Sequence, residues 1–178
     1  MKYHKLKMTF NVIGFKLSWV ACVLGAVAGY SYVGPVLMAA YVIINTRLFG
    51  FQRSEILFLL FAAVIGTVID SLKSSTGFIT YTGGYANISW IAPLWITALW
   101  LGFAATLNHS LGWLRDNTIL AFVIGAVFGP LAYIGGSKIG GITLNFPIPV
   151  TVFVLSLIWG TIMPSFYLLS KKLRTVRV

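Results

Sequence analysis

Long apolar segments that carry almost no charge follow one another along the whole chain, and this pattern constrains the fold more than any motif. The run from Ile56 to Ile69 is one of them and contains no charged residue. Charged residues make up 9 % of the 178 residues, whereas about 25 % is usual in a soluble domain. Such a chain cannot cover a core with polar surface, so we predict an integral membrane protein.

A transmembrane helix needs about 20 predominantly apolar residues, so the chain has room for roughly five or six of them. We predict an all-α fold, a polytopic membrane helix bundle of about six transmembrane helices that forms a single domain over residues 1–178. The predicted spans are about 12–30, 32–47, 54–71, 90–108, 118–135 and 147–169.

The basic residues indicate which side of the membrane each loop faces. With the amino terminus inside, eleven of the thirteen Lys and Arg residues fall on the inner side, and the outer loops hold only Lys73 and Lys138. Cytoplasmic loops usually carry such an excess, so we predict that both termini are cytoplasmic. The net charge of +10 stems from these flanks, and no basic patch has a soluble scaffold. We therefore predict the lipid bilayer, and no nucleic acid, as a partner.

Asp70 is the strongest single candidate for a functional residue. It is one of three carboxylates in the chain, it ends a long apolar run, and Lys73 follows three residues later. Residues at this spacing share a helix face, and ionisable residues within spans are costly and often functional. An ion pair of Asp70 with Lys73, or with Lys138 across the bundle, explains the residue equally well as a structural anchor, so both interpretations stay open.

Aromatic residues gather in the half of the bundle that is predicted to face outside. Core packing is their default role, but they could instead line an apolar pocket that holds an acyl chain or a flat apolar ligand. Tyr81, in the long outer loop, fits an aromatic belt at the membrane interface. The ligand-binding candidates are Asp70, Lys73, Trp90, Trp95, Trp100, Tyr133 and Lys138.

Two stretches, ACVLGAVAG at 21–29 and AFVIGAVFG at 121–129, share a pattern of small residues four apart. Small residues on one helix face let membrane helices approach closely. The simplest interpretation is that two helices meet their neighbours in the bundle through these faces. Alternatively, one face contacts another membrane protein or a second copy of the chain. The residues concerned are Ala21, Gly25, Gly29, Ala121, Gly125 and Gly129.

The sequence indicates no catalytic site. His109 lies next to Ser110, but adjacent helical residues point about 100° apart, which is not the geometry of a catalytic dyad. Cys22 is the only cysteine and is expected to be a small packing residue. Glu55 lies near Arg53 and is expected to pair with it at the surface. We assign no catalytic residue, no metal site and no cofactor, and an enzymatic function is not favoured.

Four stretches taken together carry a resemblance: NVIGF with Trp19 downstream, GTVIDS, APLWITALWLGFAATLNHSLGWL and GAVFGPLAYIGG. The chain resembles a family of small inner-membrane proteins of Gram-negative bacteria that is catalogued as a domain of unknown function. The resemblance covers most of the chain and implies a multi-span fold in the bacterial inner membrane. Members lie near genes for fatty-acid modification and oxidative-stress responses, which points towards lipid work. It implies no catalytic residues.

Three functional hypotheses follow. The favoured one is a protein that binds a lipid or small apolar ligand in the outer half of the bundle and is accessory to fatty-acid or lipid modification. The second is a substrate-binding membrane subunit of a vitamin-type transporter, in which the small-residue face of the first helix would dock on a partner. The third is a structural or assembly protein without a ligand, in which Asp70 matters only for stability.

Overall fold

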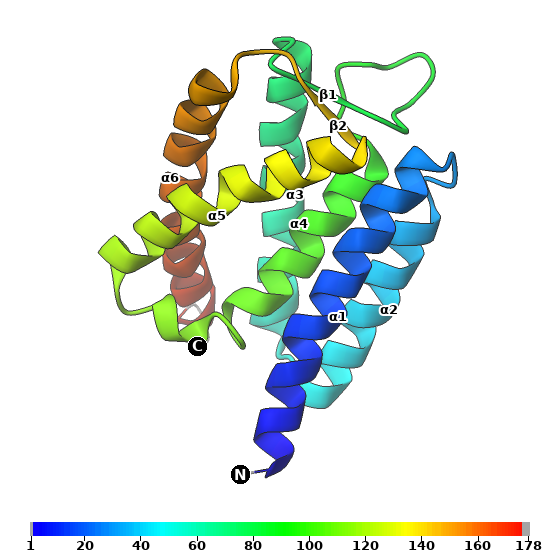
Figure 1. Ribbon diagram of the computed structural model, residues 1–178. Coiled ribbons are helices and arrows are strands. Elements are labelled where there is room, and N and C mark those ends of the chain that lie inside the picture. Colours follow the sequence, from blue (N-terminus) through cyan, green and yellow to red (C-terminus); the bar gives the residue numbers. More distant parts are fainter. Residues whose placement is uncertain (1, 176–178) are drawn as a thin grey trace.

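The computed structural model describes residues 2–175, and the other residues, among them Arg177 of the predicted inner-side charges, lie outside the described part. Within residues 2–175, six α-helices confirm the predicted all-α bundle (Figure 1). They are α1 (Lys2–Val27), α2 (Val33–Phe49), α3 (Arg53–Ser75), α4 (Leu94–Leu107), α5 (Thr118–Ile139) and α6 (Ile148–Thr175). The short elements between them are the strands β1 (Ile79–Tyr81) and β2 (Ile142–Leu144) and the 3-10 turn η1 (Gly112–Leu114).

Four of the described helices, α1, α3, α5 and α6, are long and apolar enough to cross a membrane. The other two are also apolar but shorter, with 17 residues in α2 and 14 in α4. α4 begins later than the predicted span because Pro93 precedes it with extended backbone angles, φ −65° and ψ 159°. α1 begins at Lys2, well before the predicted start at residue 12, because its basic first turns continue the helix beyond the apolar stretch. The chain is thus a protein with membrane-spanning helices.

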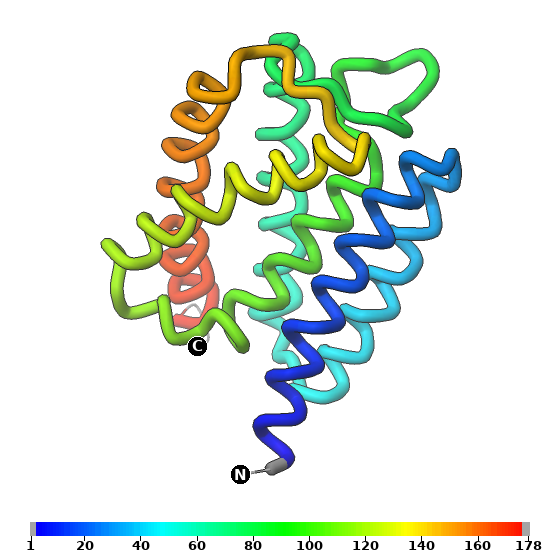
Figure 2. Tube along the Cα trace, in the orientation of Figure 1, coloured from blue at the N-terminus to red at the C-terminus, as the bar shows by residue number. Residues whose placement is uncertain are grey.

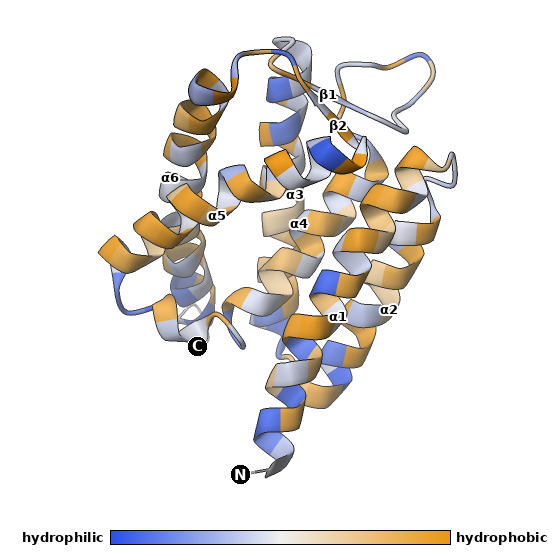
Figure 3. Cartoon of the chain, viewed as in Figure 1, coloured by the Kyte–Doolittle hydropathy of each residue, from blue (hydrophilic) through white to orange (hydrophobic). Residues whose placement is uncertain are grey.

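The helices pack as three neighbouring pairs, α1 with α2, α3 with α4, and α5 with α6. α5 crosses the bundle obliquely, starting beside α6 and ending beside the far ends of α1 and α4 (Figure 1). Both ends of the traced chain lie at the same end of the bundle (Figure 2), which we call the inner end. Hydrophilic residues gather there on α1, α2, α3 and α6 (Figure 3). The opposite end is called the outer end below.

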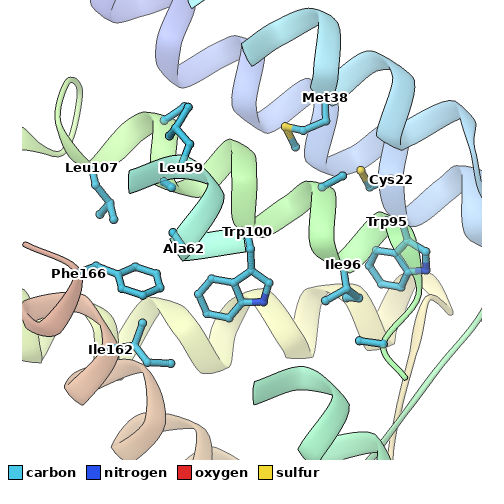
Figure 4. Close-up of a cluster of buried hydrophobic side chains, with 14 of the residues drawn as sticks. Cys22, Met38, Leu59, Ala62, Trp95, Ile96, Trp100, Leu107, Ile162 and Phe166 are labelled. Carbon is cyan, nitrogen blue, oxygen red and sulfur yellow. The ribbon is translucent and has the colours of Figure 1, made fainter. Parts of the chain in front are cut away.

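Small residues and large side chains interlock in the core. A Cβ added at Gly34 of α2 would lie 2.2 Å from the Cα of Cys22 on α1, so these two helices touch backbone to backbone. Cys22 is fully buried there. Figure 4 shows Met38 on the same side of the core and Phe166 of α6 beside Trp100. The rings of Phe166 and Trp100 meet edge to face, with centroids 5.9 Å apart.

A two-stranded antiparallel sheet closes the outer end. Residues 79–81 pair with 142–144, and Tyr81 lies opposite Ile142. The left-handed backbone of Gly140, with φ 95°, ends α5 and turns the chain back towards the first strand. Thr82 extends the pairing, because its amide donates to the carbonyl of Gly141 at 3.0 Å. The sheet therefore ties the long loop after α3 to the end of α5.

Candidate functional site

A buried carboxylate lies where four segments of the chain meet. Asp70, on α3, is 1 % exposed. Its Oδ1 accepts hydrogen bonds from the hydroxyls of Tyr81 at 2.5 Å and Tyr133 at 2.6 Å. Its Oδ2 accepts one from the indole nitrogen of Trp100 at 2.5 Å. Lys73 forms an ion pair with Oδ1. We call these five residues the Asp70 cluster.

Each member of the Asp70 cluster reaches it for a local reason. α3 continues to Ser75, so Lys73 stays on the same helix face as Asp70, one turn later. Tyr81 comes from β1, where alternate side chains point to the same side. Along Ile79–Tyr81 the residues are buried, exposed and buried in turn, so Tyr81 faces the interior. Burial, followed by the charge of Asp70, raises the pKa of Tyr81 well above its ordinary value. Its hydroxyl therefore keeps its proton and donates a hydrogen bond to the carboxylate.

The charges of the Asp70 cluster balance within it. The ammonium of Lys73, which is 5 % exposed, also donates to the hydroxyl of Tyr133 at 2.5 Å and lies 4.1 Å from the centre of that ring. A buried charge is tolerated only when it is paired and its remaining hydrogen-bonding positions are filled. Asp70 is paired with Lys73, and both of its oxygens accept hydrogen bonds, so the cluster is neutral as a whole.

Two stacked tryptophans extend from the Asp70 cluster into the bundle. The rings of Trp100 and Trp159 are nearly parallel, at 7°, with centroids 4.7 Å apart. Glycines make room on either side of this pair. A Cβ at Gly66 of α3 would lie 2.0 Å from Trp100, and one at Gly129 of α5 would lie 2.1 Å from Trp159. Any side chain at either position would push an indole away from its place.

An apolar cavity of about 520 Å³ lies beside these indoles, bounded by α1, α4 and α5, with α6 behind. Asp70, Trp95, Trp100 and Tyr133 line it, so the cavity brings together four of the predicted ligand-binding residues. Five of the six tryptophans of the chain contribute to its wall. α5 approaches α1 near the outer end, where a Cβ added at Gly135 would lie 3.7 Å from the indole ring of Trp19. Towards the inner end the two helices diverge (Figure 1).

The structure separates the remaining ligand-binding candidates from this cavity. Trp90 is 59 % exposed and lines a different groove, between α2, α3 and α4. Lys138 is exposed in the last turn of α5, and the ion-pair partner of Asp70 is Lys73 rather than Lys138. Trp95, one of the four candidates that do line the cavity, is fully buried. Its indole N–H donates a hydrogen bond to the carbonyl of Thr82 at 2.9 Å.

The two small-residue stretches lie in different surroundings. Ala121, Gly125 and Gly129 face α6, since an added Cβ at Gly125 would lie 2.4 Å from the carbonyl oxygen of Trp159. Ala21 is half-buried, and Gly25 faces the turn into α2. Gly29 lies after the end of α1, in a turn with φ 81° and open space around it. It is therefore not part of a helix face.

The inner end holds polar groups that the sequence interpretation assigned differently or overlooked. Nε2 of His109 lies 2.8 Å from Oε1 of Glu55, so Glu55 pairs with this histidine and the expected pairing with Arg53 was wrong. Asn11 and Asn45 are fully buried and bonded to each other at 3.1 Å. Two asparagines inside apolar stretches are a signal that could have found this network, because polar residues in spans need partners.

Two members of the site region also escaped the sequence interpretation. Tyr81 was assigned to the aromatic belt, but its hydroxyl is buried against Asp70. Trp159 was not singled out, and no spacing relates it to Trp100. Among the described residues, no three His, Cys, Asp or Glu side chains gather as a metal site.

No curated protein and no solved structure matches the chain. One family does: the model described as "Protein of unknown function (DUF2878)" matches residues 8–165. This confirms the resemblance to a family catalogued as a domain of unknown function. The matched stretch contains every residue of the Asp70 cluster and the stacked Trp159. The chain therefore belongs to the DUF2878 family of proteins of unknown function.

Proposed function

We propose that the protein binds an acyl chain, or an apolar molecule of similar shape, in the cavity bounded by α1, α4 and α5. The observation that carries the proposal is an apolar cavity of about 520 Å³ that ends at a neutral Asp70 cluster. Protein interiors are otherwise close-packed. The volume falls within the range of about 300–1,000 Å³ that ligand pockets usually occupy.

The position of the cavity supports an apolar ligand taken from the bilayer. Its walls belong to α1 and α5, which are among the four spanning helices. Phe128 of α5, which is 60 % exposed, and Trp113, which is 62 % exposed, stand at its border. These border residues face the acyl chains of the bilayer. A lipid chain therefore enters the cavity laterally from the membrane, between α1 and α5, without crossing a polar layer.

The Asp70 cluster supports binding rather than chemistry. Both oxygens of Asp70 accept hydrogen bonds from side chains of the protein, and its charge is balanced by Lys73. Its role in the proposal is to hold α3, α4 and α5 together and so give the cavity a fixed outer end. In this proposal the protein holds a lipid chain as an accessory to lipid or fatty-acid modification, and no reaction is assigned to it.

The location in a bacterial inner membrane with both termini in the cytoplasm is part of the same proposal. It is supported by the distribution of Lys and Arg, because cytoplasmic flanks usually carry most of these residues. The hydrophilic inner end holds both termini of the traced chain (Figures 2 and 3).

The test is native mass spectrometry of the protein extracted gently from its membrane. We expect a co-purified acyl lipid of defined mass. Ala132 lines the cavity, so Ala132→Trp should fill it and remove the bound lipid. Ala40→Trp is the matched control, because Ala40 is exposed on α2 and contacts neither groove. A protein without bound lipid, or equal lipid in both variants, would overturn the proposal.

A further inference from the structure

One lysine lines the apolar cavity. Apart from Asp70, Lys16 of α1 is the only charged residue among the described residues that form its wall. Lys16 follows Val12 and precedes Trp19 and Val23 on the same helix face, and all four contribute to the lining. The face of α1 that borders the cavity is therefore apolar except at this position.

Lys16 lies deep along its helix. Near the inner end of the bundle, the ammonium of Lys7 bonds to the carbonyl of Leu48. Lys16 follows Lys7 by nine residues, which corresponds to roughly 13 Å of helix at 1.5 Å per residue. Lys16 therefore lies inside the first predicted span, residues 12–30, and not in its basic flank. A charge at that depth is costly and is usually found where it contacts a partner or a ligand.

Within the part of the chain that the structure describes, Lys16 has no acidic partner. The acidic side chains with a basic neighbour there are Asp70, which pairs with Lys73, and Glu55, whose Oε1 lies 2.8 Å from Nε2 of His109. Lys16 also makes no side-chain hydrogen bond to another residue of the described part of the chain. Because Lys73 balances Asp70, the cavity is left with one net positive charge in surroundings of low dielectric constant, which attract an anion.

We propose that Lys16 binds the anionic head group of a single-chain lipid whose acyl chain occupies the cavity. This inference rests on the proposed function and names the class of its ligand. Helical side chains lean towards the amino terminus, and long lysine side chains reach towards the nearer interface. The ammonium of Lys16 therefore extends towards the inner end. A carboxylate or phosphate head group meets it there, and the chain runs outward along Trp19 to Trp100.

The test is quenching of tryptophan fluorescence in the purified protein by brominated single-chain probes of equal length. The probes are a fatty acid, an alkyl phosphate and a neutral fatty alcohol. Trp19, Trp95 and Trp100 line the cavity, so a brominated chain bound there quenches their emission. We expect the anionic probes to bind more tightly than the alcohol, and the tighter of the two identifies the head group as carboxylate or phosphate.

Variants of the lysine separate charge from packing. Lys16→Gln should weaken the anionic probe about tenfold, the effect of 1.4 kcal/mol, and leave the alcohol unchanged, whereas Lys16→Arg should retain the preference. Lys138→Gln is the matched control, because Lys138 is exposed outside the cavity.

The outcomes distinguish this inference from the proposed function. If the acid, the phosphate and the alcohol quench alike in the wild type and in Lys16→Gln, the cavity binds acyl chains but Lys16 does not bind their head group. The inference is then wrong. If no probe quenches and Ala132→Trp changes nothing, the proposed function falls with it. Lys16 is exposed, so Lys16→Gln should fold normally, and its gel-filtration profile checks this.

Discussion

The indole nitrogen of Trp100 lies 2.5 Å from Oδ2 of Asp70 and donates a hydrogen bond to it. The other oxygen of Asp70 accepts from Tyr81 and Tyr133 and pairs with Lys73, so with this bond both oxygens have partners. It also fixes the plane of the indole that forms part of the cavity wall. The arrangement favours the interpretation of Asp70 as an anchor that gives the cavity its shape.

Asp70→Asn should destabilise the protein strongly. The side chain keeps its size but loses its charge, and the ammonium of Lys73 is then left buried without a counter-ion. Removing one partner of a buried pair typically costs about 3–5 kcal/mol. We expect a clear fall in the thermal unfolding midpoint in detergent, measured by circular dichroism.

Two variants control for this effect. Asp116→Asn, at an exposed position, should leave the midpoint unchanged. Adding Lys73→Met to Asp70→Asn should recover part of the loss, because it removes the unpaired charge. An Asp70→Asn protein as stable as the wild type would show that the pair does not hold the bundle.

Tyr81→Phe should loosen the outer end of the bundle. The change removes one hydrogen bond to a charged acceptor, which is usually worth about 1.5–3 kcal/mol, while the buried ring is kept. Since Tyr81 joins β1 to Asp70, the loop around it should open more readily. Limited proteolysis between α3 and α4 measures this, and Tyr85→Phe is the control, because Tyr85 is 44 % exposed. Equal cleavage rates in the two variants would contradict the assignment.

Gly66→Ala should displace Trp100. The new Cβ would lie 2.0 Å from the indole, which must then move away from Asp70 and Trp159. Overpacking a core commonly costs about 1–3 kcal/mol. We expect lower stability together with a changed near-ultraviolet circular dichroism spectrum, which reports the stacked indoles. Gly84→Ala, whose added Cβ has its nearest neighbour at 3.9 Å, should preserve both. An unaltered spectrum in Gly66→Ala would mean that the two rings are not packed as described.

Local patterns were sufficient to predict the helices, and they failed where distant segments meet. The apolar runs and the scarcity of charge predict six helices, and the Asp70–Lys73 spacing predicts that both share a face. The pairing of residues 79–81 with 142–144 could not be predicted, because strands of three residues carry almost no periodic signal. Consequently Tyr81 was assigned to the membrane interface.

The cavity illustrates the same limit for side chains that lie within helices. Trp95, Trp100 and Tyr133 stood out by type and position, but Trp90 has the same features and lies in another groove. The difference depends on which way each helix is rotated. Packing sets that rotation, for example through Gly66 against Trp100. From the sequence, Lys16 counts only among the inner-side basic residues, and its place in the cavity wall depends on how α1 packs with α4 and α5.

The sidedness of the bundle can be tested with single cysteines in a Cys22→Ala background, since Cys22 is the only native cysteine and is buried. Ala86→Cys lies in the exposed loop between α3 and α4, whereas His4→Cys lies in the first turn of α1 and Thr175→Cys is the last residue of α6. If the basic residues mark the cytoplasmic side, a membrane-impermeant maleimide should label only Ala86→Cys in intact cells. The other two should react once the membrane is permeabilised. The reverse pattern would invert the topology. Labelling of His4→Cys without Thr175→Cys, or the opposite, would mean an odd number of crossings, and one of the two short helices, α2 or α4, would then not span the bilayer.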